Sequence, residues 1–276
     1  MILAQSPEVR EIIDLLVTEV HAILGEHLIG IYLYGSLATG GFDRNSDVDY
    51  VVVTNEELSE GQFTAIEAVH NHLKTMEVWC ADQLEGSYIP IEGLKRYDPA
   101  RALFVHIDRG PDEHLHRIQL ADERLSRAWW GGWVLLRLTL RESGMTLVGP
   151  DPKILIDPVP DAEIRQAAVF NVNDWAGSIL SDPAQIKGRG YQSYTVLTLC
   201  RILYTLHTGK VTSKPEAIRW AKAHLDEKWT PLIDRAWLGR QNPGLAAELG
   251  DLNETLAFIR FTIKDSQQIE LAKKAK

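Results

Sequence analysis

Residues 30–53 read GIYLYGSLATGGFDRNSDVDYVVV. The run that ends at Tyr34 is short, apolar, β-branched and aromatic, and so is the run from Val48 to Val53, so both are predicted to be strands. Gly35 permits a sharp turn and a close approach of the backbone to a ligand. Ser36 can offer a hydroxyl beside free backbone N–H groups at a helix start, which suits phosphate oxygens. The stretch therefore predicts two strands joined through a phosphate-binding turn.

Two aspartates mark the start of the second of these strands. Asp47 and Asp49 are two residues apart on an extended segment, so both carboxylates leave the same face. Carboxylates are hard oxygen ligands, and two of them on one face can hold one or two Mg²⁺ ions. The apolar run behind them anchors the pair in the sheet. A magnesium site is therefore predicted at Asp47 and Asp49.

Further elements surround this stretch. A helix is predicted from Ser6-Pro7, as N-cap and first helical residue, to Leu24, and another over residues 60–79. Residues 86–91 favour a third strand at a sheet edge, because Pro90 cannot donate to a ladder. Residues 133–141 favour a helix. Glu85 stands at the start of the third strand, where it is either a solvated side chain or a general base.

The second half of the chain has a different pattern. Helical spacing or proline at a helix start predicts helices over residues 161–171, 193–207, 215–225, 231–238 and 246–269. Residues 1–157 carry a charge of −12 and residues 158–276 a charge of +3. Four prolines and a glycine fall between residues 148 and 160, which is typical of a linker. We expect an α+β protein, with an α/β domain over residues 1–156 and an all-helical bundle over residues 157–276.

Composition excludes several classes of protein. The 276 residues are 45% hydrophobic and 24% charged, as in a globular protein, and no apolar run is long enough to span a membrane. The net charge of −9 argues against nucleic acid as the main partner and is compatible with a cationic small substrate. The two cysteines exclude a disulfide scaffold, and the N-terminus has no basic segment of a secretory signal. We expect a cytoplasmic protein.

Motifs along nearly the whole chain resemble one family. Gly35-Ser36 followed by Ser46-Asp47-Val48-Asp49 is similar to the polymerase β-like nucleotidyltransferases. The second half resembles the helical C-terminal domain of the streptomycin/spectinomycin (aminoglycoside) adenylyltransferases, in the stretches Leu147–Pro150, Asp157–Pro160, Asp174–Gly177, Val196–Tyr204 and Thr208–Lys210, with Lys214 and Trp220-Ala221. The resemblance implies Mg²⁺-dependent transfer of AMP from ATP to a hydroxyl of an aminoglycoside or aminocyclitol antibiotic, with release of pyrophosphate. ATP and the drug would bind between the two domains.

The resemblance also implies roles for individual residues. Asp47 and Asp49 would hold two Mg²⁺ ions, and Glu85 would be the general base. The remaining nucleotide-binding residues would be Gly35, Ser36 and Ser46 at the triphosphate, Arg201 and Lys214 as its neutralising cations, and Trp237 either against the nucleotide or in the core.

The drug-binding positions depart from the family pattern. Family members use two acids four residues apart around the Trp-Ala-Gly segment. Here Asp174 is present, but Ser178 stands where the second acid would follow, and alignment from Arg201 puts Tyr191 there. Asp182 lies within an extra stretch, residues 178–190, and could substitute for the missing acid. Lys187 and Arg189 in the same stretch would repel a polycationic drug.

Two other functions compete with drug adenylylation. One is an adenylyltransferase that acts on a different small-molecule or protein hydroxyl. The other is a non-catalytic nucleotide-binding or antitoxin-like module, which predicts the loss of a metal carboxylate or of the base, whereas Asp47, Asp49 and Glu85 are all present. The expected ligands are ATP and a hydroxyl-bearing, cationic small molecule, without nucleic acid or membrane, bound by a monomer.

Overall fold

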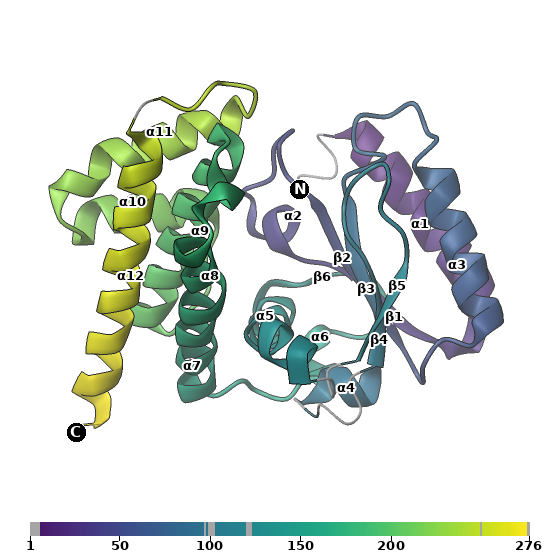
Figure 1. The fold of residues 1–276 in the computed structure, drawn as a ribbon. Helices are drawn as coiled ribbons and strands as arrows, with labels where there is room; N and C mark the ends of the chain where they lie inside the picture. Colours follow the sequence, from purple (N-terminus) through teal and green to yellow (C-terminus); the bar gives the residue numbers. More distant parts are fainter. Residues whose placement is uncertain (1–5, 97, 99–102, 120–122, 249, 275–276) are drawn as a thin grey trace. The chain divides into compact units, whose positions relative to one another are not determined.

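The chain divides into two compact units, Met1–Pro158 and Val159–Lys276. The computed structural model describes residues 6–274 apart from 97, 99–102, 120–122 and 249. Unit 1 alternates helices and strands (Figure 1), in the order α1 (Pro7–Leu24), β1 (Leu28–Leu33), α2 (Gly35–Thr39), β2 (Val48–Thr54), α3 (Glu60–Leu73), β3 (Leu84–Pro90), α4 (Ile91–Lys95), β4 (Leu103–Ile107), β5 (His116–Gln119), α5 (Glu123–Ser143), β6 (Met145–Val148) and α6 (Pro152–Leu155).

The strands of unit 1 form one sheet in the order β5-β4-β3-β2-β1-β6. The central pair, β2 and β3, is parallel, and each of the other neighbours pairs antiparallel. The sheet therefore brings the carboxyl end of β1 to the same edge as the amino ends of β2 and β3. The predicted acids of unit 1, Asp47, Asp49 and Glu85, lie at the amino ends of these two strands.

The two faces of the sheet are covered by different helices. Ile31, Leu33, Tyr50 and Val52 point to one face and are buried together with side chains of α1 and α3. The alternate residues, which include Val51 and Val53, are buried on the other face with side chains of α5 and α6. Figure 1 shows α1 and α3 on one side of the sheet, with α5 and α6 on the other. Asp49 has the parity of Val51, so its side chain leaves the face that α5 covers.

The third strand is longer than predicted, and its expected place at a sheet edge is wrong. β3 is an interior strand between β2 and β4. Pro90 is compatible with this place because, among the described residues, the ladder between β3 and β4 comprises Gly86, Ser87 and Tyr88 and stops before Pro90. The strands β4, β5 and β6 were not predicted, and α3 ends at Leu73, six residues before the predicted end.

Unit 2 begins after the proline-rich segment, and its described residues form helices and no strand. Its elements are α7 (Asp161–Asn171), a π-helical turn η4 (Val172–Ala176), α8 (Gly177–Ser181), a 3₁₀ turn η5 (Pro183–Ile186), α9 (Arg189–Thr208), α10 (Lys214–His224), a 3₁₀ turn η6 (Glu227–Trp229), α11 (Thr230–Gln241) and α12 (Asp251–Lys274). Among the described residues of the whole chain, no helix is both long and apolar enough to cross a membrane.

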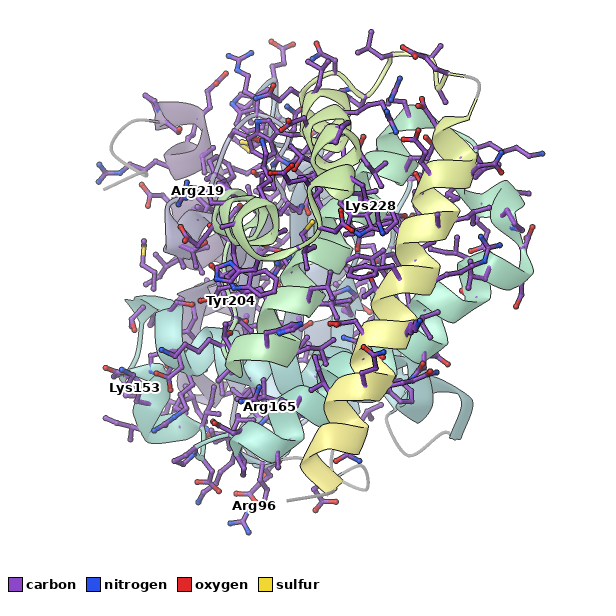
Figure 2. The ribbon with its side chains drawn as sticks, turned by 90° about the vertical axis from the view of Figure 1, so that its left-hand side faces the viewer. Arg96, Lys153, Arg165, Tyr204, Arg219 and Lys228 are labelled. Carbon is purple, nitrogen blue, oxygen red and sulfur yellow. The ribbon has the colours of Figure 1, made fainter. Side chains whose placement is uncertain are left out.

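The long helix α9 is the centre of unit 2, and α7, α10, α11 and α12 pack on it. Arg165 of α7 donates a hydrogen bond of 2.7 Å to the carbonyl of Leu206 on α9; Figure 2 labels Arg165 and shows this side of the unit. A buried carboxylate joins three helices: Asp251 of α12 lies 3.0 Å from Arg189 of α9 and 3.0 Å from Arg235 of α11. These polar contacts fix the helices around an otherwise apolar core.

Candidate active site

Two predicted acids are direct neighbours across the central strands. Asp49 of β2 pairs in register with Glu85 of β3, so both carboxylates leave the same face at the amino ends of the two strands. The preceding strand reaches the same point, since the Tyr34 N–H donates to the Asp49 carbonyl over 3.1 Å. The sheet thus brings together Asp49, Glu85 and the turn after β1, three features that lie far apart in the sequence.

Gly35 and Ser36 form that turn and open α2. Gly35 has φ +62°, in the left-handed region, and a Cβ at this position would overlap Asp49 Oδ2. Only glycine therefore lets the backbone pass beside this carboxylate. Ser36 Oγ is buried, and within the described part of the chain it has no hydrogen-bond partner. A buried hydroxyl without a partner is costly, so this atom is suited to a ligand oxygen.

The hydroxyl of Tyr34 lies in the field of all three acids. Burial, followed by the negative charges of Asp49, Glu85 and Asp47, raises the pKa of Tyr34 well above its usual value. The phenol therefore stays protonated over the whole physiological range and can donate a hydrogen bond. All three carboxylates are therefore near enough to Tyr34 to act on its hydroxyl.

Asp47 and Ser46 precede β2 and already have protein partners. The Arg109 guanidinium, just after β4, contacts Asp47 Oδ1 through Nη1. Ser46 is buried, and its Oγ accepts a 3.0 Å hydrogen bond from the Asp43 N–H and lies 3.2 Å from Asp43 Oδ1. Ser46 therefore closes the turn that leads into β2, which orients Asp47.

The donor set fits a magnesium ion that is completed by substrate. Among the described residues no group of three or more His, Cys, Asp or Glu side chains is arranged to hold a metal. Two carboxylates that leave one face are nevertheless a typical Mg²⁺ set, since Mg²⁺ keeps water or takes phosphate oxygens as its other ligands. Asp47 and Asp49 could hold the ion, with the unpartnered Ser36 hydroxyl and the turn at Gly35 beside it.

In unit 2, several predicted residues gather around Tyr194 of α9. Its ring centroid lies 5.9 Å from that of Trp175 and 5.7 Å from that of Tyr191, and Lys214 Nζ lies 5.8 Å from the Tyr194 centroid. Asp174 is exposed and precedes Trp175 in the π-helical turn η4. We call Trp175, Tyr191, Tyr194 and Lys214 the aromatic cluster. Tyr191 and Tyr194 are 47% and 45% exposed, so a ligand can reach the cluster.

Three further predicted residues of unit 2 have other surroundings. Arg201 follows Tyr194 by two turns of α9, and its Nε donates a 3.2 Å hydrogen bond to the Thr212 carbonyl, just before α10. Asp182 begins η5, where its carboxylate accepts a 3.2 Å hydrogen bond from the Ala184 N–H. Trp237 of α11 packs on the core of unit 2, with the Arg240 guanidinium 5.5 Å from its ring centroid.

Three residues at these two places were not among the predicted site residues. Tyr34 and Tyr194 were overlooked because an aromatic residue in an apolar strand or helix resembles ordinary core. Arg109 lies 62 positions after Asp47, in a segment for which no strand was predicted. The run Leu103-Phe104-Val105-His106-Ile107 was the available signal, since its apolar and β-branched residues are typical of a strand.

Comparison with known proteins agrees with both units. Residues 13–102 match the model of the nucleotidyltransferase domain, and residues 154–264 match that of the aminoglycoside adenylyltransferase C-terminal domain. An aminoglycoside (3'') (9) adenylyltransferase from Escherichia coli is 27% identical over 88% of this chain and 92% of its own length. A spectinomycin 9-adenylyltransferase from Staphylococcus aureus is 29% identical over 79% of each chain.

A solved structure has the same fold. The crystal structure of a spectinomycin adenyltransferase from Enterococcus faecialis, with ATP and spectinomycin, superposes with a TM-score of 0.66 over 94% of this chain and 99% of its own, at 16% identity. The fold and the order of the two domains define a nucleotidyltransferase. The chain carries a nucleotidyltransferase domain followed by an aminoglycoside adenylyltransferase C-terminal domain, the combination that its motifs predicted.

Proposed function

We propose that this enzyme transfers AMP from ATP to a hydroxyl of an aminoglycoside or aminocyclitol antibiotic, with Mg²⁺ and with release of pyrophosphate. The names of the relatives support this acceptor class. The observation that carries the proposal is the pairing of Asp49 with Glu85 across the two central strands, beside the turn at Gly35. Two adjacent acids, a third acid and a glycine turn lie together at one sheet edge. Few reactions other than phosphoryl and nucleotidyl transfer need this combination.

Each residue of the unit 1 site has a part in the proposal. Asp47 and Asp49 hold the metal, which when bound neutralises phosphate charge and polarises the reacting phosphate. The backbone at Gly35 and the Ser36 hydroxyl bind phosphate oxygens. Ser46, which is bonded to Asp43, acts by holding the turn before Asp47.

Glu85 takes up the proton that the acceptor hydroxyl loses. The acceptor oxygen forms a bond to the α-phosphorus of ATP, the bond from this phosphorus to the bridging oxygen breaks, and pyrophosphate leaves with that oxygen. The hydroxyl proton passes to a carboxylate oxygen of Glu85, which must be ionised before the step. Tyr34, held protonated, places a neutral hydroxyl near these acids and adds no further negative charge.

Unit 2 supplies the remaining contacts in this proposal. Arg201 and Lys214 neutralise the triphosphate, and Asp174 with Tyr191 faces the acceptor. Trp237 packs against the unit 2 core, and in the proposal the exposed part of its ring contacts the nucleotide. Asp182 already caps η5, so its use for the acceptor would require that capping bond to be shared.

A specific observation favours a second acceptor class. Where the family has a second acid, the structure has Tyr191 in an exposed cluster of three rings with one lysine. Aromatic faces bind sugar rings and single cations, whereas a polycationic drug needs several carboxylates. The alternative acceptor is therefore a hydroxyl compound of low positive charge. The same chemistry in unit 1 would transfer AMP to it.

Pyrophosphate release from Mg-ATP tests both possibilities. Wild-type protein is assayed with streptomycin, spectinomycin, other aminoglycosides and uncharged aminocyclitol analogues. Glu85→Gln should lower the transfer rate at least a hundredfold and leave ATP binding within about twofold, since it removes the base and keeps the shape. Asp47→Asn should instead abolish Mg²⁺-dependent ATP binding.

Each outcome of these assays tests a different part of the proposal. Release that depends on one cationic drug and on Glu85 supports antibiotic adenylylation and identifies the acceptor. Release only with low-charge compounds supports the second acceptor class. Unchanged turnover in Glu85→Gln contradicts the role of Glu85, and unchanged metal dependence in Asp47→Asn contradicts the metal site.

A further inference from the structure

Arg109 is a cation at the proposed metal site that the reaction scheme above does not use. Its guanidinium contacts Asp47 Oδ1, while its side chain is 46% exposed and that of Asp47 28% exposed. Other arginine pairs of unit 1 involve acids outside the site: Arg10 with Asp14, Arg96 with Asp157, Arg117 with Glu60 and Arg141 with Glu142. Arg109 therefore differs from these arginines because its partner, Asp47, is a proposed metal ligand.

The fold holds Arg109 at the edge of the sheet where the acids converge. Ile107, the last residue of β4, pairs with Gly86, the neighbour of Glu85. The chain then continues past the amino end of β3, and the Gly110 N–H donates a 2.8 Å hydrogen bond to the Asp82 carbonyl, which anchors the backbone just after Arg109. The preceding residue is anchored as well, since Asp108 Oδ1 lies 3.4 Å from His106 Nε2. The backbone is thus held at Ile107 and at Gly110, on either side of Arg109.

We propose that Arg109 is a phosphate-binding residue of this site, which pairs with Asp47 until the metal takes that carboxylate and then binds the nucleotide. The proposal rests on the function proposed above, because it assigns Asp47 to the metal. An arginine is charged at every accessible pH, so it neutralises Asp47 when no metal is present. Its contact is partly exposed, and such pairs contribute little stability, so a divalent ion can displace it.

The chemistry of the guanidinium explains why it should then bind phosphate. Asp47 and Asp49 would hold an ion that also coordinates the triphosphate, so phosphate oxygens come within the reach that the Arg109 side chain already has. A guanidinium forms paired hydrogen bonds to phosphate oxygens, which an ammonium cannot match in geometry. The same residue therefore acts on two ligands in opposite directions: it competes with the metal alone and supports the metal-bound nucleotide.

This opposition is measurable as binding, without turnover. Mn²⁺ binding to the full-length protein is followed by electron paramagnetic resonance, and Mg-ATP binding by titration calorimetry. Arg109→Gln should bind Mn²⁺ about threefold more tightly, because a competing cation is gone. It should bind Mg-ATP about tenfold more weakly, because charge-assisted hydrogen bonds are lost. Arg109→Lys should retain the competition with Mn²⁺ and recover only part of the ATP affinity.

Arg117→Gln is the matched control, since Arg117 pairs with Glu60 at 3.1 Å and its side chain is 34% exposed. We expect this variant to match wild type in both titrations, and circular dichroism should show all variants folded. Unchanged ATP affinity in Arg109→Gln overturns the proposal, whatever happens to Mn²⁺, and so does weaker Mn²⁺ binding. If wild-type protein binds no Mg-ATP at all, the proposed function itself fails, which is a different result from an unaffected Arg109→Gln.

Discussion

At the scale of single residues, the site depends on a position that has no room for a Cβ atom. Gly35 combines a left-handed φ of +62° with a position where any Cβ would overlap Asp49 Oδ2. Gly40, just after α2, has a φ of +78°, but a Cβ at this position would meet no atom within 4 Å. The two glycines thus share the backbone conformation and differ in the neighbouring carboxylate.

Gly35→Ala should cost about 1–3 kcal/mol of unfolding free energy and also weaken Mg-ATP binding at least tenfold. The stability loss comes from the left-handed backbone, and the binding loss from displacement of Asp49. Urea unfolding and titration calorimetry measure the two effects.

Gly40→Ala is the control, and it should lose about 1 kcal/mol of stability with ATP affinity unchanged. Equal ATP affinity in Gly35→Ala and Gly40→Ala would show that Gly35 is needed only for its backbone conformation.

At the scale of elements, a buried polar network joins α3 to the two central strands. The hydroxyls of Tyr50 on β2 and Tyr88 on β3 lie 3.0 Å and 2.8 Å from Nε2 of His70 on α3. A Cβ on Gly86 would overlap the Tyr50 ring, so the residue after Glu85 also makes room for this network. Burial, and then the charge of Lys74, lowers the pKa of His70 to about 3.

This network predicts a loss of stability in mild acid. The unfolded chain protonates His70 near pH 6.5, whereas the folded protein resists protonation down to about pH 3. Between these values the unfolded state binds more protons, so the contribution of His70 is complete above pH 6.5. It falls by up to about 1.4 kcal/mol per pH unit below that. The readout is the unfolding free energy in urea at a series of pH values.

His70→Gln keeps a hydrogen-bonding side chain and cannot titrate, so its curve should be flatter than that of wild type between pH 6 and pH 4. His72, on the same helix, is exposed, and His72→Gln should reproduce the wild-type slope. Parallel curves for wild type and His70→Gln would exclude His70 as the titrating group.

At the scale of the whole molecule, each unit has its own core. Two clusters of buried apolar side chains belong to unit 1 and one to unit 2, and none combines residues of both in the described part of the chain. The polar centre of unit 2 is Asp251, whose side chain is 6% exposed between Arg189 and Arg235.

Arg189→Met should therefore destabilise unit 2 by about 3 kcal/mol and leave unit 1 folded. Loss of one arginine from a buried pair leaves a carboxylate that the remaining arginine compensates only in part. Hydrogen exchange read by mass spectrometry should show faster exchange in peptides of α9, α11 and α12, with the peptides of β1–β3 unchanged.

Arg219→Met is the control, because the Arg219–Glu216 pair is exposed on α10, and it should leave the exchange pattern unaltered. Figure 2 labels Arg219. An equal loss of protection in both units after Arg189→Met would mean that they unfold as one.

Much of the fold could be predicted from local sequence patterns. The apolar, β-branched runs that end at Tyr34 and at Val53 predicted β1 and β2, because the composition of a strand is contained in its own residues. The helices of unit 2 were predicted for the same reason, since helical spacing needs no partner to be recognised. The two domains that the family models match followed from the motifs, because the residue types and order of the motifs are contained in the chain.

The sequence by itself determined β1, β2, the helices of unit 2 and the motifs of both domains, and the tertiary structure decided which residues are neighbours. The pairing of Asp49 with Glu85, the interior place of β3, and the contact of Arg109 with Asp47 across 62 positions all depend on strand order. Strand order is set by which faces can be buried together, a long-range balance of packing that no local pattern contains. Tyr34 and Tyr194 likewise took on their importance only from the carboxylates and rings that folding brought beside them.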